Sequence, residues 1–310
     1  MRPAWSVVLL TTLLGAGQGL FLALYGADLS DAARGRASLA PVFVAAAAIG
    51  SLALAAAGLA ASFLHLGRPE RAWRSAAMWR TSWLAREVIA LPLFMALVTL
   101  YGALHWTGGL QAALAAGWLA ALACVALFVC TGMIYASLKF VQEWHTPLTV
   151  ANFILLGSAS GLTAAAALAA WLHPGLVRPF VAAALIVGAL GYLTRLASLA
   201  RNARLRPKST LATAIGVKHP RIVQIAQGAM GGSFNTREFF HGRTREVVRA
   251  ARWSFLALGF PLPALIMSFT ELPTGLLAAF FLQYAGLLAE RWYFFAEAKH
   301  PQNLYYQAIG

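Results

Sequence analysis

Long runs of apolar residues, separated by short polar segments, make up most of the chain. The runs are about 20 residues long or longer, the length at which a helix crosses a hydrocarbon core of roughly 30 Å. A membrane barrel would instead show short segments in which apolar and polar residues alternate. The pattern predicts an all-α membrane protein, a bundle of eight transmembrane helices. The predicted spans are residues 5–26, 39–66, 87–106, 112–138, 147–172, 179–200, 253–270 and 274–295.

Most connections between these runs are short, as at residues 107–111 and 271–273, and short connections predict antiparallel hairpins. One connection is long, because residues 201–252 separate the sixth and seventh runs. We therefore expect a single integral membrane domain over residues 1–310, with 201–252 as a long cytoplasmic loop. The first run is full-length and no small-residue cleavage pattern follows it, so we interpret it as a retained helix and not a signal peptide.

The composition agrees with a membrane protein. Of 310 residues, 60% are hydrophobic and 11% are charged, whereas a soluble domain needs more charge to cover its surface. The two cysteines, Cys124 and Cys130, lie in one predicted helix on different faces, so they cannot form a disulfide with each other there. Two cysteines are also too few for a Cys-ligated cluster. We expect no metal in this chain and assign any iron–sulfur chemistry to a partner.

Charged residues orient the bundle. The side that holds the N-terminus receives 21 of the 24 Lys and Arg residues and seven of the ten acidic residues, a net charge of +14, and the other side receives three of each. Short loops rich in Lys and Arg remain in the cytoplasm. We therefore predict a multi-pass protein of the bacterial cytoplasmic (inner) membrane with both termini inside, N-in/C-in. The loop between the second and third runs supports this independently with Arg68, Arg71, Arg74, Arg80 and Arg86.

Residues that could carry chemistry are densest between the second and third runs. Gly67 and Pro69 are expected to break the helix where His65 reaches the membrane interface, and Glu87 opens the next run. Titratable groups at such positions are costly unless they are paired or line a wet cavity. An imidazole exchanges protons near neutral pH, and a nearby carboxylate can relay them, as quinone chemistry requires. The alternative is a set of structural polar residues in an interfacial belt of tryptophans and arginines.

The same stretch carries a family resemblance. Residues 65–72 have the pattern His-Leu-Gly-x-Pro-x-Arg-Ala, and Glu87 opens the following helix. This pattern resembles the membrane-anchor subunit of dimethyl sulfoxide reductase, the DmsC type. Weaker matches are Gly-Ala-Gly-Gln-Gly at 15–19, Thr-Pro at 146–147 and Glu-Arg at 290–291. The resemblance covers the whole chain, and residues 65–87 are its specific part.

The resemblance implies a haem-free anchor for two partners, a molybdopterin catalytic subunit and a four-cluster iron–sulfur subunit. Such an anchor binds a quinone or quinol, either ubiquinone or menaquinone, and exchanges electrons with the nearest cluster. At the matching positions His65 would bond a quinone oxygen and handle its proton. Arg71 and Glu87 would shape the site and the proton path, and Gly67 would allow close approach.

The charge distribution departs from the best-known member, whose catalytic subunits sit on the outer face. Here the partners are expected on the cytoplasmic side, as in the similar anchor of the quinone-linked sulfite dehydrogenase. Residues 218–221 and 230–242 in the long loop also suggest that branch. Its phenylalanines need burial, which favours docking of the iron–sulfur subunit over a solvated basic loop beside anionic lipid. The predicted docking residues are Arg68, Arg74, Arg80, Arg237, Phe239, Phe240 and Arg243.

Other classes fit less well. A haem-binding anchor needs facing histidines inside the bundle, and no histidine falls in the middle of a predicted span, so we expect no haem. A secondary transporter would place acidic or discontinuous-helix sites near the midplane, and no acidic residue lies there. A purely structural anchor without a redox role stays open. A basic face can also bind nucleic acid, but juxtamembrane arginines ordinarily contact lipid headgroups, so we expect membrane lipid and no nucleic acid.

Five polar groups near or inside the apolar runs have structural interpretations. Gln18, Gln283 and Tyr284 are expected to form hydrogen bonds between helices. Glu290 and Arg291 are expected to pair near the end of the last helix, and the alternative is a role in a proton path.

Overall fold

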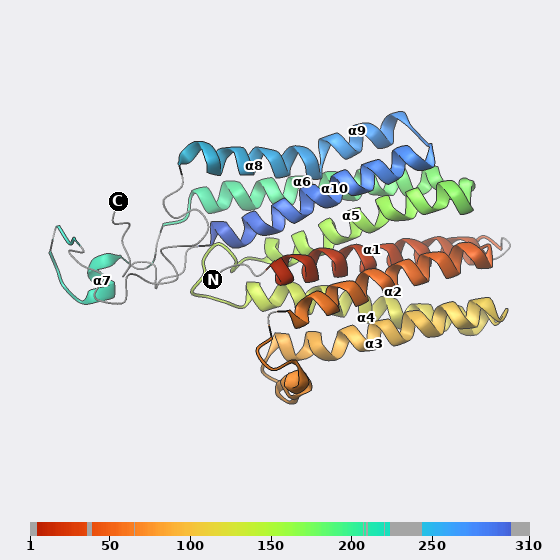
Figure 1. The fold of residues 1–310 in the computed structure, drawn as a ribbon, viewed down its shortest axis with the longest axis horizontal. Helices are drawn as coiled ribbons and strands as arrows, with labels where there is room; N and C mark the ends of the chain where they lie inside the picture. Colours follow the sequence, from red (N-terminus) through yellow and green to blue (C-terminus); the bar gives the residue numbers. More distant parts are fainter. Residues whose placement is uncertain are drawn as a thin grey trace.

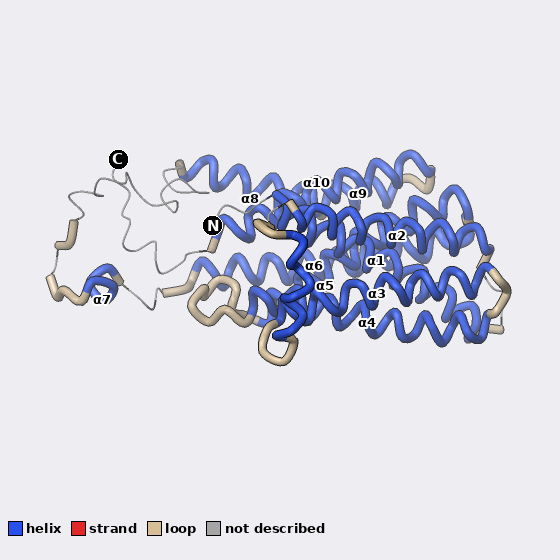
Figure 2. Tube along the Cα trace, turned by 60° about the horizontal axis from the view of Figure 1, so that its bottom comes forward, coloured by secondary structure: helices blue, strands red, loops and turns tan. Residues whose placement is uncertain are grey.

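The protein is an elongated bundle of helices, seen in a computed structural model that describes residues 5–35, 39–64, 66–206, 208, 210–219, 221–223 and 244–298 (Figures 1 and 2). The described residues contain helices and connecting turns and no strand. The elements are α1 (Trp5–Ala33), α2 (Pro41–Phe63), the 3-10 helix η1 (Pro69–Met78), α3 (Trp83–Trp106), α4 (Leu110–Ala136), α5 (Pro147–Leu172), the 3-10 helix η2 (Pro174–Leu176), α6 (Val177–Ala203), α7 (Leu211–Ile215), α8 (Arg245–Gly259), α9 (Pro261–Phe269) and α10 (Pro273–Glu297).

Seven helical segments of the described chain are long and apolar enough to cross a membrane: α1 to α5, Pro174–Ala203 and Glu246–Phe269. The last of these combines α8 and α9. The final helix, α10, has a comparable length of 25 residues, but Gln283, Glu290 and Arg291 make it less apolar. Those three side chains are buried inside the bundle and do not face its outer surface.

Consecutive helices pack as antiparallel pairs, α1 with α2, α3 with α4 and α5 with α6, and α8 also packs against α10. Figure 1 shows α3 and α4 along one edge of the bundle and α8 and α9 along the opposite edge. We call the end at which α1 begins and α10 ends the proximal end; η1 lies there too (Figure 1). The opposite end is the distal end.

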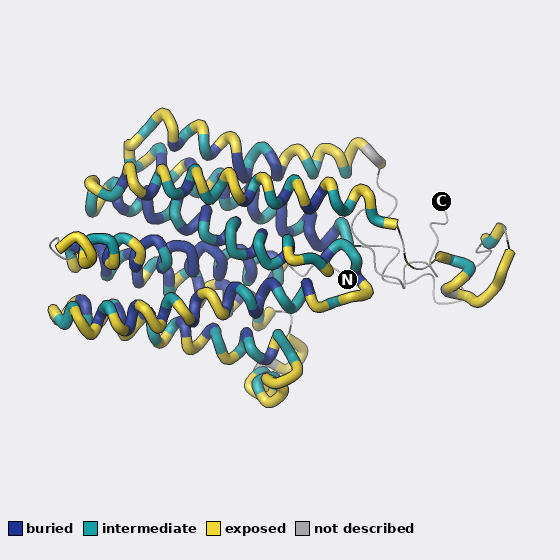
Figure 3. Tube along the Cα trace, turned by 180° about the vertical axis from the view of Figure 1, so that it is seen from behind, coloured by how far each residue is buried: buried dark blue, intermediate teal, exposed yellow. Residues whose placement is uncertain are grey.

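The centre of the bundle is built on α1 and α5. Within the most apolar window of α1, 72% of the residues are buried, against 28% for α3 and 22% for α6. The outer helices carry rows of exposed residues (Figure 3). Exposed apolar side chains such as Ile49, Trp118 and Phe281 belong to this outer surface, as expected for contact with lipid.

Glycines allow the central helices to approach each other closely. A methyl group on Gly161 of α5 would lie 2.1 Å from Gly19 of α1, and one on Gly286 of α10 would lie 2.2 Å from Gly259 of α8. Helices inside membranes associate largely through small residues that bring their backbones together. The two contacts therefore fix the α1–α5 and α8–α10 crossings.

The predicted spans agree with the observed helices, with one exception. The fifth matches at both ends, whereas α1, α3 and α6 extend a few residues beyond their predicted bounds. The seventh span, predicted at 253–270, is present but divided, because the chain breaks between α8 and α9. Phe260 leaves the helical conformation, with φ −132° and ψ −79°. Pro261 follows it, and proline removes a helix hydrogen bond and crowds the preceding turn.

Candidate functional site

Glu87 is a buried carboxyl near the proximal end of α3. Ser82 caps that helix by accepting a hydrogen bond from the Ala85 amide at 3.3 Å. The helix start turns the Glu87 side chain toward α4, where it is 6% exposed. Thr131 of α4 donates its hydroxyl proton to Glu87 Oε1 over 2.5 Å. A buried carboxyl needs such a partner, and a hydroxyl can serve both its charged and its neutral form.

The arginine beside Glu87 points elsewhere. Arg86 donates to the backbone carbonyls of Trp79 and Arg80, each at 2.9 Å, and its guanidinium lies 4.2 Å from the centre of the Trp83 ring. Arg86 therefore fixes the turn that leads into α3. Among the described side chains, no cation forms an ion pair with Glu87.

The segment before α3 forms an exposed basic and aromatic surface at the proximal end. Arg74 lies 5.6 Å from the Trp73 ring centre, and Arg80 lies 5.4 Å from that of Trp79. Both rings are more than half exposed. Such cation–π contacts are worth about 0.5–1 kcal/mol at exposed sites. We define the η1 surface as Arg68, Trp73, Arg74, Trp79 and Arg80.

The remaining predicted quinone residues are placed as follows. His65 lies outside the described residues. Arg71 is exposed on η1, and its ion pair is with Glu70 at 3.8 Å, so the described contacts do not join it to Glu87. Gly67 is exposed, and a methyl group there would meet nothing within 4 Å. Neither packing nor a positive φ requires glycine at that position.

The predicted docking residues fall into two groups. Arg68, Arg74 and Arg80 are exposed on the η1 surface, as docking requires. The others, Arg237, Phe239, Phe240 and Arg243, lie outside the described residues. Between α6 and α8 the structure describes residues 204–206, 208, 210–219, 221–223 and 244, which include α7.

An aromatic cluster lies next to Glu87. Tyr135, one turn after Thr131 on α4, is within electrostatic reach of both Glu87 and Arg291. Its ring stacks on Phe153 with centres 5.5 Å apart. The guanidinium of Arg291 lies 3.8 Å from the Phe153 ring centre. Sequence reasoning missed Thr131 and Tyr135, although they are polar groups four positions apart in an otherwise apolar run.

Arg291 belongs to a buried set of charges that we call the proximal ion network, Arg195, Glu290, Arg291 and Glu297. Arg195 Nε of α6 lies 2.7 Å from Glu290 Oε1, and Arg195 Nη2 lies 3.7 Å from Glu297 Oε2. Arg291 Nη2 is 3.7 Å from Glu290 Oε2. The expected Glu290–Arg291 pair is present, but the shorter pair joins α10 to α6.

A second buried cluster lies at the distal end. The Tyr101 hydroxyl donates to Asp28 Oδ2 at 2.8 Å, and His105 Nε2 lies 3.5 Å from Asp28 Oδ1. Leu91 and Val98 are buried on the same face of α3 between this cluster and Glu87. The 14 residues from Glu87 to Tyr101 span roughly 21 Å of helix. The two polar clusters are therefore separated by apolar side chains.

Two of the three expected interhelical hydrogen bonds are present. Gln18 Nε2 donates to the Cys124 carbonyl at 2.9 Å, and the hydroxyls of Thr12 and Tyr284 lie 3.1 Å apart. Gln283 differs, because its buried carbonyl oxygen has no hydrogen-bond partner. Both cysteines are buried and free. In the part of the chain that the structure describes, no three His, Cys, Asp or Glu side chains are grouped to hold a metal ion.

Seven candidate spans, polar pairs between helices and a basic aromatic surface at one end define a multi-pass helical membrane protein. The family of DMSO reductase anchor subunits (DmsC) matches residues 1–292, and the chain belongs to this family. The resemblance seen in residues 65–87 is thereby confirmed. A subunit of the sulfite dehydrogenase of Allochromatium vinosum is 54% identical over 325 aligned positions, which cover both chains in full.

Proposed function

We propose that this chain is the quinone-reactive membrane anchor of a molybdopterin oxidoreductase of the sulfite dehydrogenase type, in the inner membrane of a bacterium. Membership of the anchor family and the full-length relative named as a sulfite dehydrogenase subunit support this assignment. The observation that carries the quinone site is Glu87, a carboxyl buried at the proximal end and held by Thr131. The nearby η1 surface supplies an exposed face on which an electron-transferring partner can dock.

The proposal includes eight spans with both termini in the cytoplasm. The eighth is α10, whose 25 residues reach roughly 37 Å at 1.5 Å per residue. Its polar residues are buried against other helices, so lipid does not have to accommodate them. An even number of spans returns the chain to the proximal end. That end carries the excess of Lys and Arg, so the positive-inside rule assigns it and loop 201–252 to the cytoplasm.

Within this proposal, oxidation of sulfite to sulfate in the catalytic partner releases two electrons and two protons. Reduction of a quinone to a quinol takes up the same numbers. Electrons would enter at the proximal end from the four-cluster iron–sulfur subunit, docked on Arg68, Arg74, Arg80 and the loop residues Arg237, Phe239, Phe240 and Arg243. Protons would enter from the same side.

Glu87 would hold the proton that a quinone oxygen receives, and Thr131 would keep the carboxyl oriented in either protonation state. His65, on the other side of the η1 segment in sequence, would bond that oxygen. Arg71 would act at the edge of the site, because its exposed side chain is paired with Glu70. Gly67 leaves open space in which a flat ring could approach the backbone.

The broken helix is the one feature that favours a different class. Discontinuous helices form the ion and substrate sites of many secondary transporters, usually with charged groups beside the break. Here the residues that line the space at the break are apolar except for Tyr192 and Gln283. Without a charge at that depth, ion-coupled transport has no coordinating group, and the anchor assignment is preferred.

The test is quinone reduction by the assembled complex that carries Glu87→Gln or His65→Ala. Each change should lower sulfite-dependent quinone turnover by about a hundredfold or more, the lower range for loss of a proton-transfer group. Sulfite oxidation with a water-soluble electron acceptor should be unchanged, because the catalytic partner is intact. Glu271→Gln, at an exposed carboxyl that pairs with Arg178 at the distal end, is the matched control. Normal quinone turnover in both variants would reject the site and favour a purely structural anchor.

A further inference from the structure

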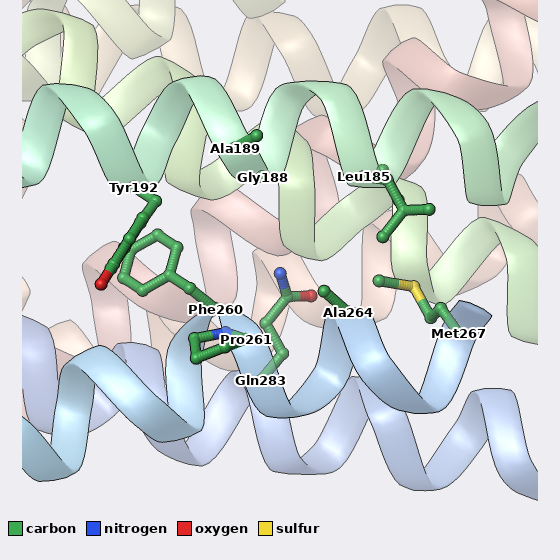
Figure 4. A pocket seen from close by; sticks show the side chains of 10 residues that line it. Leu185, Gly188, Ala189, Tyr192, Phe260, Pro261, Ala264, Met267 and Gln283 are labelled. Carbon is green, nitrogen blue, oxygen red and sulfur yellow. The ribbon is translucent and has the colours of Figure 1, made fainter. Parts of the chain in front are cut away.

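A cavity of about 190 Å³ lies beside the break between α8 and α9 (Figure 4). Three helical segments enclose it, α6, the α8–α9 break and α10. Its lining includes Tyr192, Phe260, Met267 and Gln283 together with small residues of α6 and α9. None of the lining residues is a carboxylate, an imidazole or a cation.

The local backbone explains why space remains here. Gly286 holds α10 tightly against Gly259 of α8, one residue before the break. At Phe260 the chain leaves the helical path, and α9 begins in a new direction at Pro261. On the facing helix, Gly188 leaves room, since a methyl group there would meet nothing within 4 Å. The close packing of α8 on α10 before the break, together with the small side chains of α6 beside the break, therefore leaves a cavity.

Gln283 supplies the cavity with a polar group. Its side chain is 3% exposed, and its carbonyl oxygen has no hydrogen-bond partner. Figure 4 shows the amide directed into the cavity between α6 and α9. Buried polar groups are nearly always hydrogen-bonded, and the cost of leaving one unpaired is greatest where no water is present. An occupant that hydrogen-bonds the amide would remove this cost.

The cavity opens sideways toward the bilayer. Phe260 and Met267 are buried, whereas Ala189 and Pro261 at the rim are exposed on the outer surface of the bundle. Pro261 is the sixteenth of the 24 residues of the span Glu246–Phe269, and Gln283 is the eleventh of the 25 residues of α10, so the opening faces the hydrocarbon core. An occupant must therefore enter from the lipid phase. Phospholipid headgroups stay at the membrane surface, and acyl chains have no hydrogen-bonding atom at this depth.

We propose that this cavity is a bilayer-accessible site for the ring of a quinone or quinol, recognised by the Gln283 amide. An amide both donates and accepts hydrogen bonds, so it can bind the carbonyl of the oxidised ring and the hydroxyl of the reduced ring. Tyr192 and Phe260, with ring centres 5.0 Å apart, provide aromatic surface beside it. The inference rests on the proposed quinone function of the chain.

The site would hold the molecule without reacting with it. Its lining has no group that delivers protons near neutral pH, and it lies on the opposite edge of the bundle from α3 (Figure 1). Its role would be to retain quinone from the bilayer close to the complex and to receive quinol before release.

A photoreactive azidoquinone tests the site in the purified complex in lipid nanodiscs, with labelled peptides identified by mass spectrometry. Wild type should be labelled within 177–203 or 261–269 as well as near Glu87. Gly188→Leu should fill the cavity and abolish the first labelling only, while Gly26→Leu, at another glycine with open space, should leave both unchanged. Unlabelled quinone should compete with the label at the cavity peptides. In Gln283→Leu, the quinone concentration needed for half-maximal competition should rise about tenfold, as for loss of one hydrogen bond of ordinary strength.

Several outcomes would overturn the inference. They are labelling near Glu87 with none at the cavity, cavity labelling that persists in Gly188→Leu, and displacement of the label by phospholipid but not by quinone. The proposed reaction site is judged separately. Normal turnover in Glu87→Gln would remove that site even if the cavity were labelled, so the two failures are distinguishable.

Discussion

Arg195 of α6 and Glu290 of α10 form an ion pair inside the bundle, with Nε 2.7 Å from Oε1 and both side chains 2% exposed. The pair joins two helices that border the lipid-facing cavity and places charge where lipid cannot reach it. Arg195 also lies 5.4 Å from the Phe255 ring centre, so its guanidinium is enclosed by α8 as well.

Breaking this pair from one side should be more damaging than removing it entirely. Arg195→Leu leaves Glu290 buried beside only Arg291 and should destabilise the bundle by about 3–5 kcal/mol, the cost of an unpaired buried charge. The triple variant Arg195→Leu, Glu290→Leu and Arg291→Leu should recover part of that loss, because Glu290 is also the ion-pair partner of Arg291 and neither is then left buried without the other. Thermal unfolding in detergent measures both. A triple variant less stable than Arg195→Leu would show that the ion pairs are not the source of the stability.

The glycine contact between α1 and α5 should tolerate no side chain. In Gly161→Ala the new methyl group would lie 2.1 Å from the Gly19 backbone, so the two central helices must separate. We expect a loss of about 3 kcal/mol or more, the upper range for overpacking. Gly26→Ala, which meets open space, is the control and should change stability by less than about 0.5 kcal/mol. Equal unfolding temperatures for the two variants would contradict the tight crossing.

Helix ends are the features that the chain encodes most locally. Thr146 and Pro147 begin α5 at the predicted residue, because a capping hydroxyl and a proline act within one turn. The break in the seventh run is also local, because it lies at Pro261, but that run was predicted from its apolar residues alone. Glu87 was singled out as a titratable group at the start of a span, and the structure buries it, yet nothing local identifies Thr131 as its partner. That pairing depends on how α3 packs on α4.

The partners of buried charged residues were harder to predict from the sequence than helix ends. Arg195 was included in the positive charge of the basic face although it falls inside the predicted span 179–200, and the structure buries it fully. Glu290 lies 95 positions later, and no spacing rule connects them. The same applies to Asp28, which was counted with the distal loops and instead joins Tyr101 inside the bundle. Long-range pairs of this kind follow from tertiary packing, which periodicity does not specify.

Thr131 should be needed for turnover because it orients Glu87. Thr131→Val keeps the volume but removes the only described hydrogen bond to the carboxyl, and quinone turnover should fall about tenfold. Thr131→Ser keeps the hydroxyl and should retain most of the activity. Thr99→Val, an exposed threonine on α3, is the control for a general effect of the substitution. If Val and Ser at position 131 gave the same turnover, the hydrogen bond would have no functional role.

Substitution of Gly67 can distinguish a role in quinone binding from a role in folding. A methyl group has open space there and the backbone does not require glycine, so Gly67→Ala should leave the free energy of unfolding within about 0.5 kcal/mol of wild type. If a quinone approaches this backbone, the KM for quinone should rise while turnover with a soluble acceptor stays constant. An unchanged KM would remove Gly67 from the proposed site.

A substitution in the distal cluster tests from which side of the membrane the protons for quinone reduction are taken up. Asp28 and Tyr101 are hydrogen-bonded at 2.8 Å, but the buried side chains of α3 between them and Glu87, such as Leu91 and Val98, are apolar and cannot carry protons. Tyr101→Phe should therefore lower stability by about 1 kcal/mol, as for loss of one buried hydrogen bond, and leave quinone turnover unchanged. Thermal unfolding and steady-state turnover of the assembled complex measure the two effects. If Tyr101→Phe instead slowed turnover at unaltered stability, a proton path would have to cross the bundle from the distal end, and the assignment of proton uptake to the proximal side would be wrong.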